Sequence, residues 1–278
     1  MIKKSLISGL IISIVYSVVI ELNPELSFHP HLWQGNLVKA QKYIYDDDNT
    51  SKENILVGSS LSNRIVMDSL PGFYNLAFPG QSSYDGLRII KNMNILPKNI
   101  YIETNFALRE ENEKFINSLF HPVFFYSAKY IPIMRIQKQP IGVFIEELYK
   151  FLDIKSDDIE KPVNEDLFQQ LFQDQEKEFS WDPGETRIKK QTDLMAEFVD
   201  YFEKNGVKIY FYEVPINYKL VQYTYPSIAR NSMKEKFPPE RYHYLPSDTS
   251  KYKTTDGLHF NKQEAARYTH FFKTHIPH

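Results

Sequence analysis

Residues 55–65 read ILVGSSLSNRI, and this stretch decides the fold. Three apolar residues run into Gly58, which is typical of a buried strand that stops at a turn. Ser59 and Ser60 follow at once, and the polar residues after them predict the start of a helix. A strand that passes directly into a helix indicates the first half of a βαβ unit. A serine at such a turn is either a nucleophile or an ordinary helix cap.

The same alternation of strand and helix patterns continues along the chain. Strands are predicted at residues 54–60, 73–79, 99–105, 207–216 and 241–246. Helices are predicted at residues 62–70, 82–94, 186–206 and 261–276, with an aromatic loop between the fourth and fifth strands. Strands that alternate with helices at this spacing indicate an α/β protein with a parallel sheet.

The alternation of strand and helix patterns stops between residues 107 and 185, where aromatic, charged and Gln-rich segments follow one another. We expect a mainly helical insertion or cap here, whose helices either pack on the sheet or form a lid or a surface for a partner or a membrane. The expected domains are therefore an N-terminal segment at 1–22, a stalk at 23–52, and one α/β domain at 53–278 that contains this insertion.

The N-terminus carries a membrane signal. Lys3 and Lys4 precede residues 5–20, an apolar run without a charge that is slightly shorter than the ~20 residues needed to span a bilayer. No cleavage motif of the A-x-A type follows, which favours an uncleaved anchor over a cleaved signal peptide. Because positive charges stay in the cytoplasm, we expect an anchored, extracytoplasmic domain. The alternative is a secreted or periplasmic protein after cleavage.

The composition excludes several function classes. The 278-residue chain has a net charge of −2 and no dense basic tract, so we expect no binding to nucleic acid. It has no cysteine, which removes thiol nucleophiles, disulfides and Cys-ligated zinc. No His, Asp and Glu cluster has the spacing of a metal site, so we expect no metal and no organic cofactor. Aromatic content is high, at 15%.

Polar residues suited to acyl-transfer chemistry follow the predicted strands. Ser60 comes after the first strand, Gly80 after the second and Asn105 after the third, and Asp256 and His259 precede the last helix. In parallel sheets the carboxyl ends of the strands form the site, so these residues are expected to converge. Each has a structural explanation of its own, as a helix cap or a turn residue. Together they supply a nucleophile, a base, an acid that orients the base, and oxyanion donors.

These motifs resemble the four blocks of the SGNH, or GDSL-type, hydrolase superfamily, over about residues 53–105 and 186–275. Gly58-Ser59-Ser60 stands at the nucleophile block, and Asp256-Gly257-Leu258-His259 matches the Asp-x-x-His block in full. The resemblance implies that Ser60 is the nucleophile, His259 the base and Asp256 its orienting acid. Ser59 is a departure, because the family has an acidic residue there.

The other two blocks concern the oxyanion hole. The stretch NLAFPGQS offers Gly80, and IETN offers Asn105 with Glu103 at a position where the family has glycine. The resemblance implies that the hole is formed by the N–H groups of Ser60 and Gly80 and by the Asn105 side chain. It also implies a three-layer α/β/α sandwich with a flavodoxin-like parallel sheet.

The variant blocks are similar to those of membrane-anchored, acyltransferase-like members that modify cell-surface polysaccharides. This similarity implies an acyl-serine intermediate and transfer of an acetyl or other acyl group to or from an extracytoplasmic glycan. A membrane-bound O-acyltransferase is the implied partner. Two alternatives stay open, namely an extracytoplasmic esterase of carbohydrate or lipid and a non-catalytic scaffold of an envelope acylation complex.

Overall fold

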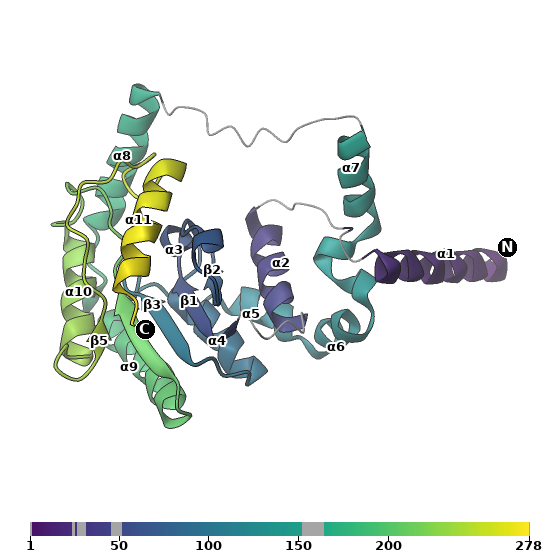
Figure 1. Ribbon diagram of the computed structural model, residues 1–278, viewed down its shortest axis with the longest axis horizontal. Helices are drawn as coiled ribbons and strands as arrows, with labels where there is room; N and C mark the ends of the chain where they lie inside the picture. The colour runs from purple at the N-terminus through teal and green to yellow at the C-terminus, as the bar shows by residue number, and fades with distance from the viewer. Residues whose placement is uncertain (1, 24–25, 27–31, 46–51, 152–163, 278) are drawn as a thin grey trace. The chain divides into compact units, whose positions relative to one another are not determined.

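The computed structural model describes residues 2–23, 26, 32–45, 52–151 and 164–277 and divides into two compact units (Figure 1). We call Met1–Asp47 with Glu113–Ile159 the helical unit, and Asp48–Asn112 with Glu160–His278 the sheet unit. Both units are built from two separate stretches of chain. The predicted insertion is therefore shared, because its residues 113–159 belong to the helical unit and its residues 107–112 and 160–185 belong to the sheet unit.

The sheet unit contains five strands, β1 (Asn54–Gly58), β2 (Phe73–Ala77), β3 (Asn99–Glu103), β4 (Lys208–Tyr212) and β5 (His243–Tyr244). Their spatial order is β2-β1-β3-β4-β5, and every neighbouring pair is parallel. This order is the one found in flavodoxin-like doubly wound sheets. The α/β prediction is confirmed, and each strand lies inside its predicted segment.

Helices cover both faces of this sheet. On one face α4 (Ser83–Met93) packs beside α9 (Gly184–Lys204), where the Tyr84 hydroxyl donates to the Gln191 carbonyl at 2.7 Å. On the other face lies α11 (Lys262–His275), whose Phe272 ring contacts the rings of Tyr101 and Tyr212 (Figure 1). Alternate strand residues point to opposite faces, which gives the three-layer α/β/α sandwich.

The predicted helix at 62–70 is wrong in its extent. The helix after β1, α3 (Ser60–Asn63), makes one turn, and a short 3-10 turn, η2 (Met67–Ser69), follows. The Val66 N–H donates to the Thr269 hydroxyl at 2.9 Å, so tertiary contacts take backbone groups that a longer helix needs. The Ser62 carbonyl similarly accepts from the Asn75 side chain at 2.9 Å.

The expected aromatic loop between the fourth and fifth strands is also wrong in part, because it contains α10 (Thr224–Lys236). Its buried residues Tyr225, Ala229 and Met233 recur every four positions, which is a helical period. The other helix of the sheet unit is α8 (Glu165–Phe179), in the part of the predicted insertion that this unit contains.

The helical unit contains α1 (Ile2–Leu22), α2 (Leu32–Tyr45), α5 (Glu113–Phe120), α6 (Pro122–Tyr130), two 3-10 turns η3 (Pro132–Met134) and η4 (Ile136–Lys138), and α7 (Pro140–Phe151). The predicted stalk at 23–52 is wrong in part, because residues 32–45 form helix α2. It packs against the predicted insertion, because Gln41 accepts from the Ile136 N–H at 2.9 Å and the Tyr45 hydroxyl donates to the Phe125 carbonyl at 3.2 Å.

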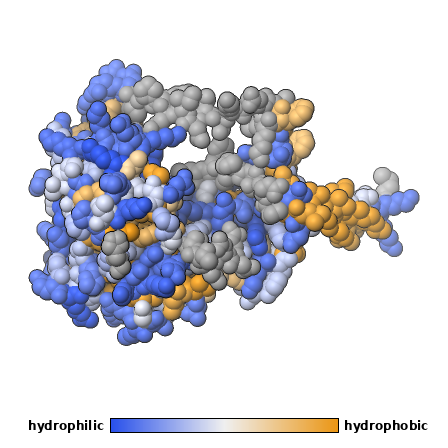
Figure 2. Space-filling view, viewed as in Figure 1, coloured by the Kyte–Doolittle hydropathy of each residue, from blue (hydrophilic) through white to orange (hydrophobic). Residues whose placement is uncertain are grey.

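Within the described residues, α1 is the one helix long and apolar enough to cross a membrane. Its candidate span, Lys3–Leu22, is almost entirely uncovered by protein, and Figure 2 shows it as an apolar rod. By length and composition it is either a membrane anchor or a signal sequence.

Gly86 in α4 allows this helix to approach the sheet closely. A Cβ atom at Gly86 would lie 2.7 Å from the Val57 side chain and 2.8 Å from the Leu76 carbonyl oxygen. Glycine to alanine inside a helix normally stabilises by up to about 1 kcal/mol. Here overpacking reverses the sign, so we expect Gly86→Ala to lower the free energy of unfolding by about 1–3 kcal/mol in urea denaturation.

Asn92→Ala, at an exposed position of the same helix, is the matched control and should change stability by less than about 0.5 kcal/mol. A Gly86→Ala variant that is as stable as the parent would contradict this account of how α4 packs on β1 and β2.

Candidate active site

The structure brings Ser60, His259 and Asp256 into one hydrogen-bonded relay. The Ser60 Oγ lies 2.7 Å from His259 Nε2, although the two residues are far apart in the chain. On the other side of the ring, His259 Nδ1 lies 2.6 Å from Asp256 Oδ2. With the Nδ1 proton on the aspartate side, Nε2 is free to accept the serine proton. The geometry is that of a serine nucleophile with an oriented base.

The loop that carries Asp256 and His259 is shaped by its own hydrogen bonds. Asp256 Oδ1 accepts from the backbone N–H groups of Leu258 at 2.9 Å and His259 at 2.8 Å, so the carboxylate folds back over its own turn. Gly257 has a φ of +95°, and a Cβ atom there would lie 2.8 Å from the Phe172 ring. Both the backbone conformation and the space therefore require glycine between the two functional residues.

These contacts set the charge state of Asp256. Burial alone would raise the pKa of its carboxyl group, but hydrogen bonds from the His259 ring and from backbone N–H groups outweigh burial and hold the pKa below its usual range. The folded state therefore binds this proton more weakly than the unfolded chain does. The resulting stabilisation is present above the ordinary pKa of aspartate and is lost as the pH falls through the lowered value.

Glu103 is a central residue of the site. In the sequence it stands at the position where the SGNH family has glycine, and the motifs predict no role for it. It is the last residue of β3, is 1% exposed, and its carboxylate lies under the turn that carries Ser60. Oε1 accepts from the Ser59 hydroxyl at 2.6 Å, and Oε2 accepts from the Ser59 N–H at 2.8 Å. Oε2 also accepts from the Ser62 hydroxyl at 2.5 Å and the Ser62 N–H at 3.2 Å. Four donors therefore offset the cost of burying this group.

Two neighbours complete this arrangement, which we call the Glu103 cradle and define as Glu103, Ser59, Ser62, Tyr212 and Gly58. The Tyr212 hydroxyl donates to the Ser62 Oγ at 2.6 Å, and burial together with the charge of Glu103 raises the pKa of this tyrosine well above its usual value. At Gly58 a Cβ atom would lie 2.8 Å from both Glu103 Cβ and Ser62 Oγ. The glycine before the two serines therefore makes room for the carboxylate.

The cradle leaves one N–H of the turn unused. The Ser59 and Ser62 N–H groups bond Glu103, and the Leu61 N–H bonds the Ser59 hydroxyl at 3.2 Å, so Ser59 is the cap of α3. Among the described residues the Ser60 N–H has no such acceptor. It is thus available to an oxyanion formed next to the Ser60 hydroxyl.

Gly80 and Asn105 stand on either side of Ser60 in the sheet order, because β2 and β3 flank β1. Gly80 is exposed and has a φ of +76°, which glycine adopts without strain. Asn105 bonds the Val214 backbone in both directions, with Nδ2 donating at 2.8 Å and Oδ1 accepting at 2.8 Å. An amide nitrogen carries two hydrogens, so one donor is left over. Their roles as oxyanion donors stay predictions.

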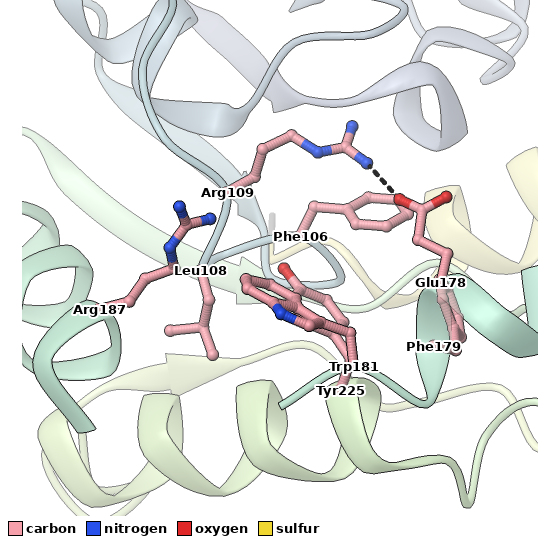
Figure 3. A pocket seen from close by; sticks show the side chains of 8 residues that line it. All are labelled: Phe106, Leu108, Arg109, Glu178, Phe179, Trp181, Arg187 and Tyr225. Carbon is pink, nitrogen blue, oxygen red and sulfur yellow. Dashed lines mark hydrogen bonds and ion pairs between the residues drawn. The ribbon is translucent and has the colours of Figure 1, made fainter. Parts of the chain in front are cut away.

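A pocket open to solvent begins at the residue after Asn105 (Figure 3). Its lining is formed by Phe106, Leu108, Arg109, Glu178, Phe179, Trp181, Arg187 and Tyr225. Phe106 directly follows Asn105, and Arg109 Nη1 donates to the carbonyl of Gln81, the neighbour of Gly80, at 3.4 Å. Figure 3 shows the Arg109 guanidinium reaching toward Glu178, at 3.4 Å. One lining residue thus neighbours Asn105 in the chain and another contacts the residue after Gly80, and the pocket offers aromatic and charged groups to a ligand.

The cradle predicts a specific effect of Glu103→Gln. Glutamine keeps the shape of the side chain but replaces one acceptor oxygen with an NH₂ group, which is itself a donor. Donor groups of Ser59 or Ser62 then face this NH₂ group and lose their acceptor. We expect the free energy of unfolding to fall by about 1–3 kcal/mol, measured by urea denaturation. The exposed Glu197→Gln in α9 is the control, and unchanged stability of Glu103→Gln would contradict the role given to the carboxylate.

The comparison with known proteins is negative at each level. No protein-family model matches the chain. No curated protein and no solved structure matches it. The resemblance to SGNH hydrolases therefore rests on the motif blocks of this sequence, and the residues of the site are interpreted from their own geometry.

Proposed function

We propose that this protein carries out serine-dependent acyl-ester chemistry through an acyl-serine at Ser60, most plainly O-acyl transfer to or from a cell-surface glycan. The observation that carries the proposal is the relay from Ser60 through His259 to Asp256, with distances of 2.7 and 2.6 Å. A capping serine needs no histidine on its hydroxyl, and a structural histidine needs no carboxylate on its far nitrogen. Together they form an activated nucleophile.

The chemistry follows from the positions of the protons. His259 Nε2 takes the Ser60 proton as Oγ attacks the ester carbonyl, and the carbonyl oxygen becomes an oxyanion. The proposed donors to it are the Ser60 N–H, the Gly80 N–H and the Asn105 amide. As the ester C–O bond breaks, the imidazolium returns the proton to the leaving alcohol. A second hydroxyl, from water or from a glycan, then attacks the acyl-serine by the same steps in reverse.

Two features favour a glycan of the cell envelope as the substrate. The apolar α1 with Lys3 and Lys4 at its start supports an anchored protein whose remaining chain lies outside the cytoplasm. The pocket next to Asn105 has the aromatic side chains on which sugar rings stack, together with arginines suited to acidic groups. An extracytoplasmic esterase uses the same relay with water as the acceptor and is the second candidate.

Removal of the nucleophile tests the chemistry. We expect Ser60→Ala to lower the rate of hydrolysis of p-nitrophenyl acetate by at least about 10³-fold, because the relay then has no acyl acceptor. Ser69→Ala, at an exposed serine of η2, is the matched control and should retain the parental rate. A serine-reactive fluorophosphonate should label Ser60, as mapped by peptide mass spectrometry.

A parental rate in Ser60→Ala, or a label on another residue, would overturn the assignment of Ser60. A protein that neither hydrolyses the ester nor reacts with the phosphonate would instead support a non-catalytic scaffold.

The acyl acceptor decides between the two enzymatic candidates. With an activated acetyl donor and an added uronate or hexose oligosaccharide, a transferase should place acetyl groups on the oligosaccharide and release correspondingly less free acetate. Mass spectrometry of the oligosaccharide and enzymatic measurement of acetate give both quantities in one reaction. Acetate release that is unaffected by every acceptor would favour the esterase.

A further inference from the structure

The helical unit, which includes α1, exposes a second set of apolar side chains. Helix α7 exposes Ile141, Phe144, Ile145, Leu148 and Phe151, a series at helical spacing in which every side chain is between 39% and 86% exposed. The acidic residues Glu146 and Glu147 of the same helix are partly buried. The helix therefore turns its apolar side outward, which is the reverse of a soluble helix.

Helix α6 and η3 of the same unit also expose apolar side chains. The exposed apolar side chains there are Val123, Phe124, Tyr126, Tyr130, Ile131 and Met134. We call these residues and those of α7 the apolar collar. Eleven exposed apolar side chains on three elements of one unit are more than the scattered single residues that need no explanation, and they indicate an interaction site.

The collar is tied to the end of α1. The Tyr16 hydroxyl donates to the Lys138 carbonyl of η4 at 2.8 Å, and Ile20 is 2% exposed. Residues 3–15, by contrast, are exposed without exception. Figure 1 shows α1 projecting from the unit, with α7 running across its axis near its C-terminal end. One side of the last turns of α1, at Tyr16 and Ile20, thus packs on the rest of the unit, whereas residues 3–15 are bare.

The length of the bare part decides what the collar faces. A helix rises 1.5 Å per residue, so residues 3–15 cover about 20 Å, whereas the hydrocarbon core of a bilayer is about 30 Å thick. The bare helix is too short to cross the core alone. If α1 spans the membrane, the part of the unit that packs on Tyr16 and Ile20 reaches roughly 10 Å into the leaflet that the helix enters last.

We propose that the apolar collar lies in the outer leaflet of the membrane in which α1 is anchored, with α7 in the plane of the interface. In-plane amphipathic helices bury their apolar face about 5–10 Å into the boundary between headgroups and acyl chains, which agrees with the depth set by α1. The tyrosines of α6 suit this level, because tyrosine and tryptophan concentrate at membrane interfaces. The helical unit is therefore partly embedded in the membrane. This inference does not depend on the proposed acyl chemistry.

The chain has no cysteine, so single cysteines report on depth without a background. Phe144→Cys in α7 and Phe124→Cys in α6, each labelled with nitrobenzoxadiazole, test the collar in the full-length protein. Ile11→Cys in the bare part of α1 is the positive control. Asn117→Cys, at an exposed polar position of α5, is the matched control within the same unit. The proteins are reconstituted in phosphatidylcholine–phosphatidylglycerol vesicles with or without lipids that carry a nitroxide on the acyl chain.

The nitroxide lipid should quench the label at residues 11, 124 and 144 and leave the label at residue 117 unchanged. Quenching at residue 11 alone would overturn the proposal, since α1 would then span the bilayer without the collar. A blue-shifted emission at residues 124 and 144 without quenching would also overturn it and would indicate that a second copy of the chain covers the surface. An unquenched label at residue 11 would show that α1 does not enter the bilayer, and it would overturn the proposal as well.

Discussion

The hydrogen bonds that converge on the Glu103 carboxylate are the constraint on which the rest of the site depends. A buried carboxylate is costly unless it is fully bonded, and here two serines each offer both a hydroxyl and an N–H. These bonds hold the turn after β1 at Ser59 and Ser62. Ser60 lies between them and makes no bond to Glu103, and its hydroxyl meets His259. Ser60 is thus positioned by residues on both sides of it.

The two residues at which the sequence differs from the motif blocks it resembles are in contact with each other. Ser59 stands where an acidic residue is expected and Glu103 where a glycine is expected, and the structure joins them by a hydrogen bond of 2.6 Å. A motif comparison treats these positions as two separate mismatches, since only the fold brings β1 and β3 together as neighbours.

The sheet was predictable because its strands are short, apolar and stopped by glycine, proline or polar residues. The failures have a common cause, which is tertiary contact. The helix after Ser60 stops at Asn63 because Thr269 and Asn75 take its backbone groups, and no local pattern reports on residues so distant. The pattern of residues 32–45 does not predict α2, because the packing partners of this helix lie in α5 and η4. For the site, residue types and order predicted the relay, while the cradle needed the register of β1 against β3.

The relay also has a consequence for the order in which the protein becomes competent during synthesis. Ser60 leaves the ribosome early, soon after α1, whereas its base is the 259th residue and lies just before the last helix. Strand β4, whose partner is β3, likewise arrives only after the helical unit has been made. An unfinished chain therefore holds a serine without a base. The relay is thus unable to form until the chain has been translated past His259 and the sheet has folded.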